Sequence, residues 1–216
     1  NELAMIEEGA LQAITEITET DIASSSSSDP KLATYCAATL VNLACAGSPE
    51  VLNAMFEADV TNIVAQLSNH HATNPSVLLC CCITLCHLSR LPGARVPDMI
   101  VNSGMHALIA TNSVDVHECK KAAVAAMANL VQSDERMQVM EHIMPGLKYL
   151  AASPEPDSWL LVLSATRSLS RFDATRVTLA EAGMVAMLSK MQLDEDNVPA
   201  ALIPGVKYSL AVTLSN

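Results

Sequence analysis

Residues Lys31–Ala46 read KLATYCAATLVNLACA, and this stretch predicts one amphipathic helix. Its apolar or small side chains recur at the i, i+3, i+4, i+7 spacing of a single helical face. We expect that face to consist of Leu32, Tyr35, Cys36, Thr39, Leu40 and Leu43. Asn42 then lies at its edge, and other helices must cover the face.

The end of this helix has counterparts along the chain. Related segments end the helices expected at 77–89, 116–131 and 159–172, and one more lies at the last residues. The position of Asn42 is occupied in them by His87, Asn129, Arg171 and Asn216. These five positions are 45, 42, 42 and 45 residues apart. A fixed period in this range is typical of solenoid proteins, in which each repeat packs on its neighbours.

Shorter helices are predicted between these copies, joined by elbows at Gly9, Asp59, Gly104, Gly146 and Gly183. The elbow at Gly146 separates a helix at 134–143 from one at 147–152. A further short helix is expected at 94–102, and a final one begins at Pro199 or Pro204. Each unit then has three helices, and residues 1–216 form a single solenoid. The approximate units are 1–46, 47–90, 91–132, 133–172 and 173–216, with incomplete units at both ends.

The composition supports an all-α fold. Hydrophobic residues make up 50% of the 216 residues but aromatic residues only 3%, so the core is expected to be aliphatic, with Ala and Met. Strands favour aromatic and β-branched residues instead. The net charge of −11 disfavours nucleic acid and anionic membrane surfaces as partners. No run of 18 apolar residues predicts membrane insertion.

The sequence predicts no enzymatic, metal or cofactor site. The seven cysteines are odd in number and lie in helical patterns, which favours reduced core residues of a cytoplasmic protein. Cys86 and His87 are adjacent, but consecutive side chains of a helix diverge and no third residue would orient the base. His70 and His71, with His106 or His117, have no spacing that indicates a metal site.

The repeats resemble the armadillo family over essentially the whole chain. The most specific segments are AATLVNLAC at Ala37–Cys45, AAMANLVQ at Ala125–Gln132 and EAGMVAMLSKM at Glu181–Met191. HEAT repeats are the alternative, but they have two helices per unit. The resemblance implies a right-handed α-solenoid, and we expect this chain to be a segment of a longer array, because terminal repeats need a polar outer face.

The resemblance also implies where a partner would bind. In armadillo proteins the third helices line a concave groove, and an Asn at the position of Asn42 often hydrogen-bonds the main chain of an extended ligand. The binding residues that the resemblance implies are therefore Asn42, His87, Asn129, Arg171 and Asn216. The alternative is that this column is a polar edge without a specific ligand.

Two known ligand classes of the family are disfavoured. Nuclear-import adaptors carry Trp four residues before the Asn, where this chain has Ala38, Ile83, Ala125, Arg167 and Val212. Members that bind acidic segments carry a regular row of Lys and Arg, which is missing here.

We therefore predict a non-enzymatic scaffold that binds other proteins, including extended peptide segments, through the groove or the array ends, within a larger complex. The alternative is a structural spacer in a cytoskeletal or ciliary assembly, and a nuclear-transport adaptor is the least favoured. The expected location is the cytoplasm, including the cytoskeleton or cilium, or the nucleus and cytoplasm together.

Overall fold

The computed structural model describes residues 2–24, 29–91, 104–131 and 137–190. Within these ranges the chain forms twelve α-helices and one short 3-10 helix, and no strand. The chain divides into two compact units, residues 1–126 and 127–216. The all-α prediction is confirmed, whereas the division into five repeats stays a prediction. The helix expected at 94–102 and the final helix lie outside the described residues.

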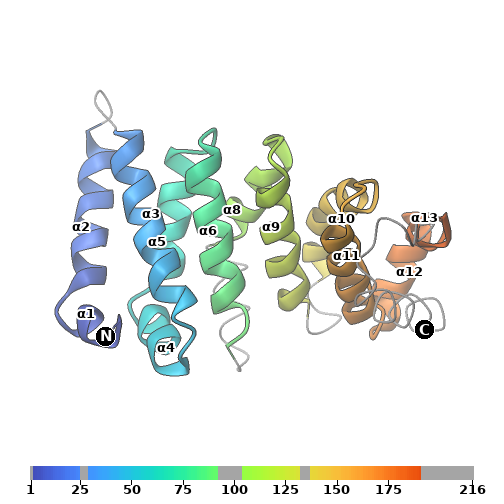
Figure 1. The fold of residues 1–216 in the computed structure, drawn as a ribbon, viewed down its shortest axis with the longest axis horizontal. Coiled ribbons are helices and arrows are strands. Elements are labelled where there is room, and N and C mark those ends of the chain that lie inside the picture. Colours follow the sequence, from blue (N-terminus) through green and yellow to red (C-terminus); the bar gives the residue numbers. More distant parts are fainter. Residues whose placement is uncertain (1, 25–28, 92–103, 132–136, 191–216) are drawn as a thin grey trace. The chain divides into compact units, whose positions relative to one another are not determined.

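In the first unit, helices that hold the same position in successive repeats pack against each other (Figure 1). Its helices are α1 (Glu2–Glu7), α2 (Ala10–Ala23), α3 (Pro30–Cys45), α4 (Pro49–Glu57), α5 (Val60–His70), α6 (Pro75–Leu88), α8 (Met105–Ala110) and η2 (Thr111–Ser113). A further helix, α9 (His117–Leu130), begins in this unit. The first helices of two repeats, α1 and α4, pack together. The second helices α2, α5 and α8 form a row, and the third helices α3 and α6 pack side by side. This arrangement is the one that repeat stacking requires.

The second unit contains α10 (Met137–Ala151), α11 (Pro156–Leu169), α12 (Asp173–Glu181) and α13 (Met184–Lys190). α10 packs against α11, α12 and α13, and α11 also packs against α12. The long helix α10 is therefore the centre of this unit.

Local sequence signals begin the third helices. The Asp29 carboxylate accepts the N–H of Lys31 at 2.9 Å, and Pro30 follows at the first helical position. The Asn74 side chain accepts the N–H of Ser76 at 3.0 Å, again just before a proline. An N-cap acceptor satisfies a backbone donor that has no partner within the helix, and proline there has no donor to satisfy. These signals set the start of α3 at Pro30 and that of α6 at Pro75.

Two of the predicted elbows depend on left-handed backbone. Gly9 has φ of 93° between α1 and α2, and Asp59 has φ of 54° between α4 and α5. Glycine adopts this conformation without steric cost, and aspartate is among the few other residues that tolerate it. Gly183 repeats the arrangement between α12 and α13. Gly104 instead has right-handed backbone immediately before α8.

The prediction of an elbow at Gly146 is wrong. α10 continues from Met137 to Ala151 with Pro145 inside it. Its buried residues keep the helical spacing across the proline: Val139, Met140, Ile143, Met144, Leu147 and Leu150. Packing of this uninterrupted apolar face outweighs the hydrogen bond that the proline removes.

The buried face of α3 also differs from the expectation. Leu32 is 38% exposed and Tyr35 is 69% exposed, although both were expected to be covered. The buried residues are Ala33, Cys36, Ala37, Leu40, Leu43 and Ala44. Small side chains allow two helices to approach closely, and α3 packs along α6. The sequence pattern predicted Leu32 and Tyr35 on the buried face because they are large and apolar, whereas small alanine residues occupy it instead.

The core is aliphatic, as the composition predicts. Among the described residues, the largest fully buried side chains are Leu40, Leu43, Met55, Leu67, Leu78, Leu85, Leu88, Leu108, Met127, Leu130 and Met140. Among the described helices, none combines the length and the hydropathy that crossing a bilayer requires.

Candidate peptide-binding surface

One row of side chains on α3 points away from the buried face. It consists of Lys31, Tyr35, Ala38, Asn42 and Cys45, spaced four and three residues apart alternately. All are exposed except Ala38, which is half-buried. This spacing places them on a single face of the helix.

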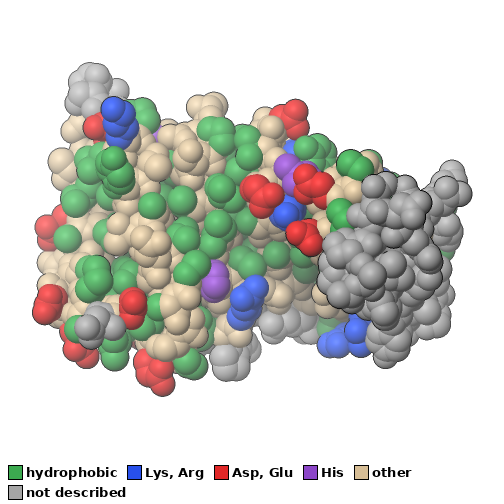
Figure 2. All heavy atoms as spheres, viewed as in Figure 1, with side chains coloured by type: hydrophobic (Ala, Val, Ile, Leu, Met, Phe, Trp, Pro, Cys, Tyr) green, Lys and Arg blue, Asp and Glu red, His purple; other side chains and the backbone are tan. Residues whose placement is uncertain are grey.

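The corresponding row on α6 is Ser76, Cys80, Ile83, His87 and Arg90, the last of which lies just beyond the helix. Ser76 and Arg90 are exposed and the other three are half-buried. Since α3 and α6 pack side by side, we call the two rows together the third-helix surface. Figure 2 shows hydrophobic side chains over these helices and acidic ones mainly towards the border of the unit.

The two rows meet at their carboxyl-terminal ends. Cys45 Sγ lies 3.5 Å from His87 Nε2, so α3 and α6 are in contact through one residue of each outward row. Burial, and secondarily the charge of Arg90, lowers the pKa of His87 below its usual 6.5. A neutral imidazole has one acceptor nitrogen, to which the Cys45 thiol can donate.

The structure places four of the five predicted binding residues. Asn42 is exposed in the last turn of α3, His87 is half-buried in the last turn of α6, and Asn129 is half-buried near the end of α9. Asn42 and His87 therefore lie on neighbouring third helices of the first unit. Asn216 lies outside the described residues.

Arg171 does not belong to a third helix. α11 ends at Leu169, and Arg171 is exposed in the turn that leads directly into α12. The Thr175 hydroxyl donates to the Leu169 carbonyl, and the Phe172 N–H donates to the same carbonyl at 3.3 Å. These bonds stop the helix before the end at Phe172 that the sequence suggested.

The third-helix surface contains little charge. Neither α3 nor α6 contains an acidic residue, and the cations of the two rows are Lys31 and Arg90 at opposite ends. Ala38, Ile83 and Ala125, which occupy the positions of the adaptor tryptophans, are half-buried and non-aromatic. This surface has no acidic or aromatic groups suited to a basic peptide, except for Tyr35.

A shallow pocket lies beside α3. It has a volume of about 430 Å³ and is lined by Glu16, Ile17, Thr20, Asp21, Ser24, Asp29 and Leu32. Ile17 and Leu32 are each 38% exposed there. Leu32 lies three residues before Tyr35, so these two exposed side chains are neighbours on the surface of α3.

Sequence reasoning missed Tyr35 and Cys45 as surface residues. Tyr35 was assigned to the core because it is large and apolar, and Cys45 because most free cysteines are buried. Tyr35 lies seven residues before Asn42 and Cys45 three residues after it, so helical spacing places both on the same face as Asn42.

No protein-family model matches the chain, and no curated protein is significantly similar to it. Solved structures match over nearly its full length. The crystal structure of computationally designed armadillo repeat proteins for modular peptide recognition has a TM-score of 0.80 and 18% identity, covering 99% of this chain and 84% of that one.

Two crystal structures of engineered proteins from the Northeast Structural Genomics Consortium are also similar. They have TM-scores of 0.77 and 0.76, both at 18% identity, and they cover 100% and 99% of this chain and 85% and 81% of theirs. These matches agree with the packing of corresponding helices in successive repeats and with the elbows at Gly9 and Asp59. They show that the chain has an armadillo-like repeat fold.

Proposed function

We propose that the chain is a non-enzymatic scaffold whose third-helix surface binds an extended segment of another protein. The observation that carries this proposal is the position of Asn42, an exposed carboxamide on the outward row of α3. The similar fold of proteins designed for modular peptide recognition supports a peptide as the ligand.

A carboxamide suits main-chain recognition. Its N–H₂ group donates and its oxygen accepts, so it can pair with both polar groups of a peptide unit whatever side chain that unit carries. His87 on α6 can still donate a hydrogen bond while it is neutral, since the Cys45 thiol lies against its acceptor nitrogen, and its lowered pKa favours the neutral form at pH 7. Asn42 and His87 would therefore hold the backbone of a bound segment on two neighbouring helices.

The side chains of the ligand would be largely apolar. Tyr35 offers an exposed aromatic ring, and Ile83 on α6 and Leu32 beside the pocket offer partly exposed aliphatic groups. Aromatic side chains contribute strongly to binding because they bury a large area at low entropic cost. The absence of acidic residues from α3 and α6 makes a lysine-rich ligand unfavourable.

Selection from a library of random extended peptides tests the proposal. The dissociation constant of a selected peptide is then measured for the wild type, Asn42→Ala and His87→Ala. Loss of one main-chain hydrogen bond should weaken binding about 5- to 30-fold, since such a bond contributes roughly 1–2 kcal/mol to affinity.

The matched control is Asn53→Ala, which removes an exposed carboxamide from α4 and leaves α3 and α6 intact. It should bind like the wild type. If Asn42→Ala and His87→Ala also bind like the wild type, the third-helix surface is not the binding site. That result would favour the alternative in which the array is a structural spacer in a larger assembly.

A further inference from the structure

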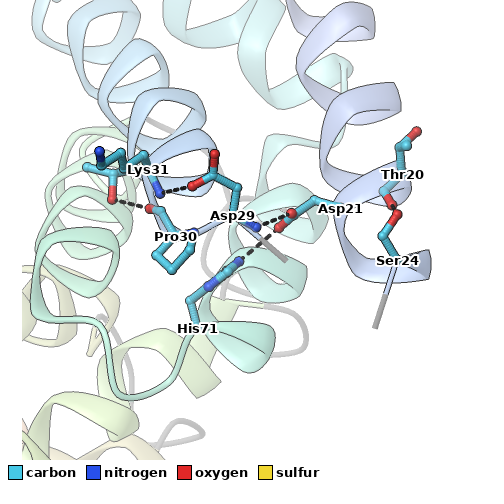
Figure 3. A network of polar contacts seen from close by, with 8 residues as sticks. Thr20, Asp21, Ser24, Asp29, Pro30, Lys31 and His71 are labelled. Atoms are coloured by element: carbon cyan, nitrogen blue, oxygen red, sulfur yellow. Dashed lines mark hydrogen bonds and ion pairs between the residues drawn. The ribbon is translucent and has the colours of Figure 1, made fainter. Parts of the chain in front are cut away.

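Asp21 and His71 form a buried pair in the first unit (Figure 3). Asp21 lies in the last turn of α2, and His71 is the residue that follows α5. His71 Nε2 lies 3.1 Å from Asp21 Oδ2, and the two side chains are only 7% and 6% exposed. They are 50 residues apart in the sequence, so the fold alone brings them together.

The Asp21 carboxylate is held in a defined orientation. Its other oxygen, Oδ1, accepts the backbone N–H of Asp29 at 2.9 Å. In Figure 3 dashed lines join the Asp21 carboxylate to both Asp29 and His71. This hydrogen bond directs Oδ2 towards the imidazole, as outer partners do for carboxylates that bind metal ions.

His70 adds a third nitrogen-bearing side chain to the pair. Its ring meets that of His71 edge to face, with centroids 4.9 Å apart, and it is exposed to solvent. Each of Asp21, His70 and His71 offers one ligand atom, and no two of these atoms are more than 4.8 Å apart.

We propose that Asp21, His70 and His71 bind one Zn²⁺ ion, which joins the carboxyl-terminal ends of α2 and α5. Two imidazole nitrogens and one carboxylate oxygen form a donor set that zinc prefers, and water completes the tetrahedron. The site is separate from the third-helix surface, and it does not depend on the proposed function.

The distances are close to those that zinc requires. Ligands about 2.05 Å from a tetrahedral ion are about 3.3 Å from one another. The 3.1 Å between His71 Nε2 and Asp21 Oδ2 already matches this value. His70 is exposed, so its ring can rotate and close the remaining distance without disturbing the core.

The backbone around the cluster also favours a cation. The carboxyl-terminal end of a helix has partial negative charge, which disfavours a carboxylate and favours a positive ion. Asp21 is in the last turn of α2, His70 ends α5, and these two helices pack together. A divalent cation would neutralise the carboxylate and both helix ends at once.

Titration of the metal-free chain with Zn²⁺ by calorimetry tests the proposal, and Co²⁺ serves as a spectroscopic probe of the same site. The wild type should bind one ion and give the visible absorption of tetrahedral Co²⁺ without a sulfur charge-transfer band. His70→Ala and Asp21→Asn should each weaken Zn²⁺ binding by at least about 10- to 100-fold, as loss of even outer partners does.

Two controls keep the test decisive. His142→Ala removes a half-buried histidine of the second unit and should bind Zn²⁺ like the wild type. His70→Ala removes an exposed ring and leaves the bond between Asp21 and His71 intact, so its circular dichroism should be that of the wild type. Failure to bind Zn²⁺, a sulfur band in the Co²⁺ spectrum, or unchanged affinity in His70→Ala would each overturn the proposal.

Discussion

The thiol of Cys45 at the end of α3 lies 3.5 Å from Nε2 of His87 at the end of α6, and the two residues are 42 positions apart. A second contact joins α6 to α9 at their amino-terminal ends, where the Cys119 thiol donates to the backbone carbonyl of Pro75 at 3.4 Å across 44 positions. Neighbouring third helices therefore touch at nearly the period seen in the sequence. His87, however, meets Cys45 rather than its own counterpart Asn42.

Cys45 should be the most reactive of the seven thiols. It is exposed, whereas burial raises the pKa of the thiols of Cys36, Cys80, Cys81, Cys82, Cys86 and Cys119. A raised pKa lowers the fraction of nucleophilic thiolate. Brief alkylation of the native chain followed by mass spectrometry should find Cys45 modified first. Earlier modification of any other cysteine would contradict the burial described for α3, α6 and α9.

His87 should titrate below pH 6.5, the usual value for histidine, because burial and then Arg90 lower its pKa. The unfolded chain then binds the proton more readily than the folded chain. This contribution to folding stability is therefore greatest above pH 6.5 and declines as the pH falls towards the folded-state pKa. An NMR titration that gives the midpoint of the His87 ring tests the direction of this pKa shift. Arg90→Ala should raise that midpoint while leaving it below 6.5, and a wild-type midpoint above 6.5 would be incompatible with the burial of the ring.

Substitutions on α3 should distinguish its buried face from its exposed one. Leu40 is fully buried, and Leu40→Ala should lower the free energy of unfolding by about 2–5 kcal/mol through loss of packing and creation of a cavity. Leu32 is 38% exposed, and Leu32→Ala should cost less than about 1 kcal/mol. Urea denaturation followed by circular dichroism measures both. If both substitutions lowered the free energy of unfolding equally, Leu32 would be buried like Leu40, as the sequence first predicted.

The elbow at Asp59 should depend on its left-handed backbone. Asp59→Ala should destabilise the chain by about 1 kcal/mol, because alanine lacks the short polar side chain that makes this conformation tolerable. It also loses the bond that the Thr61 hydroxyl donates to the Asp59 carboxylate at 3.1 Å. Asp59→Asn keeps both features and serves as the control in thermal denaturation. Alanine and asparagine variants of equal stability would show that the elbow is not strained.

Local signals made much of this fold predictable. Asp29 with Pro30 marks the start of α3, and Gly9 and Asp59 mark elbows, because capping and left-handed backbone depend on residues next to each other in the sequence. The errors arose where packing decided the outcome. Pro145 does not interrupt α10, because the buried residues on both sides of it share one face.

The candidate sites were less predictable than the fold. The period placed Asn42 and His87 on successive third helices, but it could not show that Tyr35 is exposed or that Cys45 touches His87. The carboxylate beside His71 was missed altogether. Asp21 is 50 residues away from it, outside any pattern that local spacing can show.

Protection of Cys45 by a bound peptide is the most direct test of the third-helix surface. A selected peptide at about ten times its dissociation constant should slow alkylation of Cys45 about tenfold, since roughly nine tenths of the chains are then occupied. A reporter thiol introduced by Asn53→Cys on α4 should react at an unchanged rate. If the peptide binds but Cys45 reacts as fast as in the free chain, the partner binds elsewhere and the proposed function of this surface is wrong.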